Sequence, residues 1–148
     1  LIREFNQQLR ESMPIGRFVA ATVVCLDPAS KSGEIWVGGT PSALLIDRWG
    51  RKEAEFPSTQ LPLGIMDAID TQATTFTWQK ESQLLLYSDG LIEATAQDGL
   101  QFGTEGILAS VAHTTPGQRF DAVSTALAKH LGDELAADDV SLMVIDCP

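Results

Sequence analysis

Three aspartates stand beside predicted strands, where a rigid backbone could fix the position of a carboxylate. Asp89 follows the apolar run 84–87 and precedes a glycine. Asp138 and Asp139 precede the strand-like run 140–145. Asp and Gly are also common turn residues, so hydrated turn carboxylates are the simpler interpretation of each pattern taken alone. If the two strands pair antiparallel, the end of the first lies beside the start of the second, and the carboxylates meet at one edge of the sheet.

Such a cluster would suit a hard metal ion. Close carboxylates repel one another and resist burial unless hydrogen bonds or a divalent cation offset their charge. Ligands that offer only oxygen favour Mg²⁺, Mn²⁺ or Ca²⁺ over zinc. The spacing alone does not choose among these ions, and it leaves open whether the aspartates bind a metal or lie hydrated in turns.

The sequence offers little for covalent or nucleotide chemistry. Ser88 lacks the GxSxG setting of a nucleophilic serine. His113 and His130 fall on predicted helices with no partner at metal-ligand spacing, so we expect packing or surface roles for them. The stretch GGTP at 38–41 lacks the lysine of a phosphate-binding P-loop. The three aspartates therefore remain the candidate functional residues.

Composition limits the class of partner. The chain has 148 residues, of which 44% are hydrophobic, so it fits one globular domain. Twenty acidic against ten basic residues give a formal net charge of −10, which repels nucleic acid and anionic membranes because no basic patch is visible. The longest apolar stretch, 18–26, is too short to span a membrane. We therefore expect neither nucleic acid nor a membrane among the partners.

Two features bear on location and completeness. Cys25 and Cys147 lack CxxC spacing and fall in predicted strands, which indicates buried reduced thiols and favours the cytoplasm. The chain begins at Leu1 rather than Met, inside a segment whose apolar residues are spaced for one helix face. We therefore expect a fragment of a larger multidomain protein.

Periodicity predicts a mixture of helices and strands. Runs rich in Val, Thr and Ile indicate strands, and apolar residues at helical spacing indicate helices. Helices are expected at 1–12, 104–114 and 115–131, an irregular loop at 58–70, and strands at 17–27, 34–39, 42–47, 52–56, 73–79, 83–89 and 138–147. The expected class is α+β with largely antiparallel sheet.

The helix at 115–131 carries the clearest local signals. Thr115 as N-cap and Gln118 three residues later make a capping box, and Pro116 suits the first helical position. The residues expected to face the core are Phe120, Val123, Leu127 and Leu131.

Six motifs follow one another along the chain: RFVAATVVCLDP, GGTPSALLI, LPLGIMD, LLLYSDGLIEA, FGTEGIL and ADDVSLMVI. Their order resembles that of bacterial SpoIIE-type serine/threonine phosphatases, which belong to the metal-dependent protein phosphatase (PPM) superfamily. The resemblance covers nearly the whole chain, and its most specific part is YSDGLIEA followed by DDVSLMVI. Within the group, the chain is similar to the C-terminal output domain of an RssB-like or RsbU-like response regulator.

This resemblance implies a four-layer α-β-β-α sandwich that holds two Mn²⁺ or Mg²⁺ ions. A metal-activated water would attack a phosphoserine or phosphothreonine, so no covalent nucleophile is needed. By motif, Asp89 resembles the metal ligand of the family's DG signature, and Asp138 resembles the ligand that opens its terminal D-D/N motif. Asp139 is the adjacent candidate ligand. The resemblance thus makes Asp89 and Asp138 the expected catalytic residues and all three aspartates the expected metal ligands.

Two departures from the family pattern bear on activity. An upstream GD strand and a GD-x-x-GHG-like motif, which supply the bridging carboxylate, are absent, so 1–148 resembles the C-terminal portion of the phosphatase domain with its N-terminal part missing. In addition, VGGTP at 37–41 stands where relatives usually read NAGHP. We therefore expect these 148 residues alone to be inactive, even where a longer parent protein is an enzyme.

Two functions are compatible with this pattern, because fold alone does not settle function. The first is metal-dependent dephosphorylation of a phosphoserine or phosphothreonine regulatory protein in bacterial stress or sigma-factor signalling. Its partner would be a phosphorylated STAS-type anti-sigma-factor antagonist or a sigma factor. The second is a catalytically inactive pseudophosphatase that serves as a protein-binding adaptor for a sigma factor or its regulators.

Overall fold

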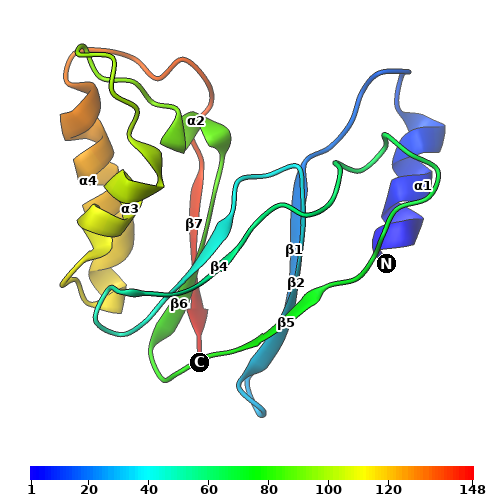
Figure 1. Cartoon of the computed structure of the whole chain (residues 1–148), viewed down its shortest axis with the longest axis horizontal. Helices are drawn as coiled ribbons and strands as arrows, with labels where there is room; N and C mark the ends of the chain where they lie inside the picture. The colour runs from blue at the N-terminus through cyan, green and yellow to red at the C-terminus, as the bar shows by residue number, and fades with distance from the viewer. The chain divides into compact units, whose positions relative to one another are not determined.

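Two antiparallel sheets, one of three strands and one of four, form the framework of the computed structural model, which describes all residues 1–148 (Figure 1). The contacts of the chain divide it into two units. The first comprises residues 1–42 and 56–77, and the second comprises residues 43–55 and 78–148. The mixture of helices and antiparallel sheet confirms the expected α+β class.

The first unit contains the three-stranded sheet, in the order β1-β2-β5. β1 (Ala21–Asp27) and β2 (Ser32–Gly38) form an antiparallel hairpin, and β5 (Thr74–Thr77) pairs with the other edge of β2. The buried apolar residues of this unit are Ile35, Trp36, Val37, Phe56, Leu63 and Phe76. The centre of its core is therefore the middle strand.

The helix of the first unit, α1 (Ile2–Ser12), is held by a polar side chain. Asn6 is 1% exposed, its Nδ2 donates to the Met66 carbonyl at 2.9 Å, and its Oδ1 accepts from the Gly64 N–H at 2.8 Å. Phe5, one of the apolar residues spaced for one helix face, is 46% exposed. One amide side chain thus joins the helix to the irregular loop that the sequence predicts.

The second unit contains the four-stranded sheet, in the order β4-β3-β6-β7. Its strands are β3 (Ala43–Ile46), β4 (Lys52–Phe56), β6 (Ser82–Tyr87) and β7 (Leu142–Cys147). β6 pairs antiparallel with β3 on one side and with β7 on the other. Both edges of β6 are therefore paired with neighbouring strands.

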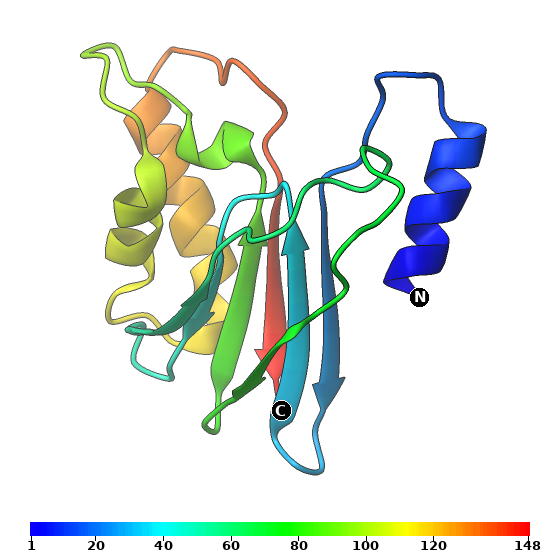
Figure 2. The same ribbon diagram turned by 45° about the vertical axis from the view of Figure 1, so that its right-hand side comes forward.

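Helices α3 and α4 lie against one face of this sheet (Figure 2). The helical elements are α2 (Asp89–Ile92), α3 (Gly103–Val111), a 3₁₀ turn (Pro116–Gln118) and α4 (Arg119–Leu131). Alternate strand residues face the helices, as the period of two requires, and the shared core includes Leu44, Ile46, Leu85, Tyr87, Ile107, Val111 and Val123. None of the helices combines the length and the apolar character that crossing a membrane needs.

The start of α4 corrects the expected core stripe. Val123 is fully buried, and Leu127 and Leu131 are partly buried against the same core. Phe120, however, is 52% exposed, so its expected core position is wrong. Arg119 takes the inward position instead, because it lies four residues before Val123 on one helix face, whereas position 120 is turned away by about 100°.

The sequence correctly predicts the capping pair before the last helix but places the start of the last strand too early. The capping pair before α4 is confirmed, because the Thr115 N–H donates to Gln118 Oε1 at 3.0 Å. The last strand is shorter than expected, since β7 begins at Leu142 and not at residue 138. The segment 138–141 is therefore a lead-in to the strand.

The two cysteines lie in different environments. Cys147 is buried, and burial raises the pKa of its thiol to about 11, so it stays protonated at neutral pH. Cys25 is exposed, so the expectation that both thiols are buried is wrong for this residue.

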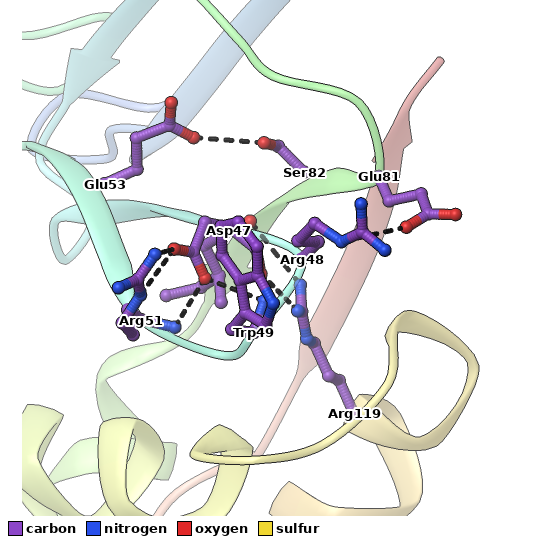
Figure 3. A network of polar contacts seen from close by, with 9 residues as sticks. Asp47, Arg48, Trp49, Arg51, Glu53, Glu81, Ser82 and Arg119 are labelled. Carbon is purple, nitrogen blue, oxygen red and sulfur yellow. Dashed lines mark hydrogen bonds and ion pairs between the residues drawn. The ribbon is translucent and has the colours of Figure 1, made fainter.

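Arg119 joins α4 to the sheet (Figure 3). Its Nη1 donates to Gln83 Oε1 at 3.1 Å and to the Ile46 carbonyl at 3.5 Å, and its Nη2 donates to the Asp47 carbonyl. Burial lowers the pKa of the guanidinium, and the charge of Asp47 acts in the opposite direction. A single buried cation therefore serves acceptors at the end of β3 and on β6.

Replacing Arg119 with Ala should lower the free energy of unfolding by at least about 3 kcal/mol, because it leaves buried acceptors unpaired and a cavity beneath β3. Urea denaturation followed by circular dichroism measures the change. Lys129→Ala, at an exposed position of the same helix, is the control and should stay within about 0.5 kcal/mol. Equal stability of the two variants would contradict this role of Arg119.

Candidate functional site

Asp89 lies at the point where buried strand β6 gives way to a short helix (Figure 1). Ser88 has extended backbone angles and is the N-cap of α2, and Asp89 is the first helical residue. The Asp89 carboxylate is exposed, and its Oδ1 accepts from the Gly90 N–H at 3.0 Å. The strand end therefore presents this carboxylate to solvent from a fixed backbone position.

The segment that carries Asp138 and Asp139 runs beside the end of β6. The Ser88 N–H donates to the Ser141 carbonyl at 3.1 Å. The Ser88 hydroxyl accepts from the Ser141 N–H at 2.9 Å and donates to the Asp139 carbonyl at 3.0 Å. One serine thus continues the β6–β7 ladder beyond the strands and fixes the backbone next to both aspartates, although 51 positions separate it from Asp139.

Gly90 allows the two segments to approach closely. A Cβ at this position would lie 2.4 Å from the Asp139 carbonyl oxygen and 3.2 Å from the Asp138 carbonyl carbon. No side chain fits there unless the backbone moves. The glycine that follows Asp89 is therefore required by packing as well as by the turn.

The structure brings the backbone next to Asp89 into contact with that of Asp138 and Asp139 at the end of the β6–β7 pair, where the antiparallel argument expects the two strand ends to meet. All three side chains are exposed. Asp138 Oδ1 accepts from the Asp139 N–H at 2.7 Å, so each of the first two aspartates bonds only to the next residue in the chain. Their remaining oxygen lone pairs face water.

The donor chemistry of this edge suits a hard divalent cation, because it offers carboxylate oxygens and neither thiolate nor imidazole. Nowhere in the chain, however, do three or more His, Cys, Asp or Glu side chains lie close enough to hold an ion together. For such an ion the three aspartates would be at most a partial ligand set. Water, or carboxylates outside these 148 residues, would have to complete it.

The two histidines contact other parts of the second unit or lie on its surface. His130 Nε2 lies 3.0 Å from the Leu100 carbonyl and 3.2 Å from the Ala94 carbonyl, and the ring packs edge-on against Phe102. His113 is exposed. The packing and surface roles expected from the sequence are confirmed.

The sequence reasoning missed the part played by Ser88, which it weighed only as a nucleophile. Both functions of the Ser88 hydroxyl, as donor and as acceptor, are taken up by the β7 lead-in. A serine between an apolar strand and a helix is an N-cap signal, and that signal could have predicted Ser88 as the N-cap of α2. Its partners could not be found in this way, because they are distant in the sequence.

The fold is that of PP2C-type phosphatases. The chain is similar to the SiaA-PP2C domain of Pseudomonas aeruginosa, with 18% identity over 98% of this chain and 58% of that chain and a TM-score of 0.82. It is also similar to the RsbU and RsbW domains of Rv1364c from Mycobacterium tuberculosis (19% identity, 95% and 39% covered, TM-score 0.71). A third similar structure is the Mn-presoaked phosphatase domain of the cell fate determinant SpoIIE from Bacillus subtilis (15% identity, 98% and 63% covered, TM-score 0.67).

The chain belongs to the SpoIIE family, because the family described as Stage II sporulation protein E (SpoIIE) matches residues 1–148. This confirms the resemblance that the motifs indicate. No curated protein matches the sequence. The chain spans less than two thirds of the length of each of the three solved structures named above.

Replacing Gly90 with Ala should lower the free energy of unfolding by about 1–3 kcal/mol, since the added methyl overlaps the backbone of the β7 lead-in. Thermal or urea unfolding measures this loss. Gly117→Ala is the matched control, because no atom lies within 4 Å of its added Cβ, and it should be neutral or stabilising by about 0.4–1 kcal/mol. A stabilised Gly90→Ala variant would show that the two segments are not in contact.

Proposed function

We propose that this chain supplies part of the metal centre of a PPM-type serine/threonine phosphatase. The observation that supports the proposal is the contact of Ser88 and Gly90 with the β7 lead-in, which brings the backbone next to Asp89 close to that of Asp138 and Asp139. Membership of the SpoIIE family supports it. Metal dependence, substrate and partner are parts of the proposal.

Asp89 and Asp138 would hold a Mn²⁺ or Mg²⁺ ion, and Asp139 is the neighbouring candidate ligand. Two such ions, when bound, supply an activated water and neutralise charge on the phosphoryl oxygens. The protein contributes fixed carboxylates at an edge open to a protein substrate. Ser88 supports the choice of water as nucleophile, because its hydroxyl is already used in both directions by the β7 lead-in.

The proposed substrate is a phosphoserine or phosphothreonine regulatory protein of bacterial stress or sigma-factor signalling. Structures with this fold include part of the chain that contains the RsbU and RsbW domains of Rv1364c and the phosphatase domain of the cell fate determinant SpoIIE, which supports a regulatory setting. A phosphorylated STAS-type antagonist or a sigma factor is the proposed partner. The cytoplasm is the proposed location, and neither nucleic acid nor a membrane is among the proposed partners.

The adaptor is the second candidate, and a feature of the first unit favours it. Val37 and Thr40 stand where relatives usually carry the Asn and His of NAGHP. Val37 is 4% exposed and apolar, and the Thr40 hydroxyl lies 2.7 Å from the Thr22 hydroxyl. Neither residue offers the polar group of its counterpart, which supports a protein that binds its partner without hydrolysis.

A phosphate-release assay on a phosphoserine protein tests the mechanism in the longer phosphatase domain that contains these residues. Turnover should require Mn²⁺ or Mg²⁺ and should fall by orders of magnitude in Asp89→Asn, because the amide keeps the shape but loses the charge that holds the ion. Asp133→Asn, an exposed position beyond α4, should keep full activity. Binding of the partner in a pull-down should survive both changes.

Metal-independent turnover, or full activity of Asp89→Asn, would refute the phosphatase mechanism. Partner binding without turnover in the unaltered longer domain would favour the adaptor. The 148 residues alone should show neither tight metal binding by calorimetry nor appreciable turnover, because the ligand set is partial.

A further inference from the structure

The turn between β3 and β4, residues 47–51, exposes the only tryptophan that is not buried. Trp36 and Trp78 are 1% and 3% exposed, and each indole N–H donates to a backbone carbonyl. Trp49 is 57% exposed. A single exposed apolar ring is common on protein surfaces, so Trp49 points to a binding site only together with the charged groups around it.

The turn is fixed internally by Asp47. The Asp47 carboxylate accepts from the Trp49 N–H at 2.8 Å, from the Arg51 N–H at 2.9 Å and from Arg51 Nε at 2.7 Å. Burial opposes ionisation of this carboxyl, but the hydrogen bonds and the charge of Arg51 outweigh it, so its pKa lies below the usual value. At neutral pH the carboxylate is charged and holds the turn in one conformation.

The same turn is also held by Arg119 of α4 and by the segment that follows α3. Arg119 donates to the Asp47 carbonyl, and the His113 N–H donates to the Trp49 carbonyl at 3.3 Å. Gly50 has φ +81°, and a Cβ there would lie 2.0 Å from the Val111 carbonyl oxygen. The turn therefore presents Trp49 on a rigid base, and a rigid binding surface loses little conformational entropy when a partner binds.

Basic side chains surround the exposed ring. The guanidinium carbons of Arg51 and Arg48 lie 4.6 Å and 5.3 Å from the centre of the Trp49 ring, and Figure 3 shows Trp49 between them. An open cavity of about 660 Å³ adjoins the ring. Its lining includes Arg48, Arg51, Lys52 and Lys80, four of the ten basic residues in a chain of net charge −10.

Two of these basic side chains form surface ion pairs with glutamates of the chain. A carboxylate of a binding partner can replace those glutamates. Arg48 pairs with Glu81 at 3.5 Å and Lys52 pairs with Glu55 at 2.8 Å, all at least partly exposed. Such surface pairs contribute only about 0–1 kcal/mol, so exchange costs little. Arg51 is different, because its bond to Asp47 is part of the turn.

We infer that this cavity is a docking site for an acidic segment of a protein partner. Carboxylates of the segment would pair with Arg48, Lys52 and Lys80, and an apolar side chain would pack on Trp49. Trp and Arg are the residue types that most often dominate binding energy at protein interfaces. Four basic side chains against the carboxylates of Asp47 and Glu53 line the cavity, so the local charge favours an acidic occupant although the chain as a whole is acidic.

The docking site is separate from the aspartates. Lys80 precedes β6, whereas Asp89 follows it, and a six-residue strand is about 20 Å long. An acidic partner can therefore bind here while the aspartate edge stays open. The inference does not rest on the proposed phosphatase activity.

Tryptophan fluorescence tests the inference directly, because only Trp49 is open to a neutral quencher such as acrylamide. The probe is a short synthetic peptide of repeated Glu-Glu-Leu, added to the 148-residue chain. Binding should reduce quenching to the level of a Trp49→Phe variant. Lys80→Glu and Arg48→Glu should weaken peptide binding by at least about tenfold, through like-charge repulsion.

Lys129→Glu makes the same change of charge at an exposed site on α4 and should bind the peptide as the unaltered chain does. A matched Gln-Gln-Leu peptide should give no protection. Equal protection of Trp49 from quenching by the Gln-Gln-Leu peptide would overturn the inference. Binding would then depend on the apolar side chains of the peptide and not on its carboxylates. Protection by inorganic phosphate in place of the peptide, or protection that grows with protein concentration alone, would equally overturn it.

Discussion

The pairing of β6 with β7 is the constraint on which the second unit depends. Six residue pairs, from Ser82–Cys147 to Tyr87–Leu142, set the register, and Ser88 extends it to Ser141. A slip of one residue would turn the core side chains of β6 to the other face of the sheet. The same register therefore decides that Leu85 and Tyr87 enter the core and that Asp89 arrives beside the β7 lead-in.

The polar contacts at this end of the ladder leave the carboxylates available. Backbone groups and the Ser88 hydroxyl join the two segments, so the aspartate side chains are not needed to hold the turn together. Each ionised carboxylate can accept about four hydrogen bonds. Asp89 and Asp138 each accept one, from the N–H of the next residue. The groups that hold the two segments together are therefore different from the exposed carboxylates, as the proposed cation site would require.

Sequence periodicity predicts the order of the elements because alternation of apolar residues reports burial directly. It also locates Asp89 and Asp138, since a strand end is visible as a change from apolar to turn residues. It fails where a polar residue occupies the core, as at Arg119 and Asn6. Their acceptors lie 36 to 73 positions away in the sequence, so no local pattern marks them.

In a phosphatase, the docking site at one end of β6 would assist the aspartates at the other end by holding the substrate near them. It would not act by changing the conformation of the strand. Allosteric coupling needs an element with two arrangements, and a packed, hydrogen-bonded strand offers one. Docking of an acidic segment near Lys80 would instead raise the local concentration of a phosphorylated residue on the same partner. About six or seven extended residues span the ~20 Å of the strand. Such tethering adds equally to the binding of substrate and transition state, so it acts on KM and leaves kcat unchanged.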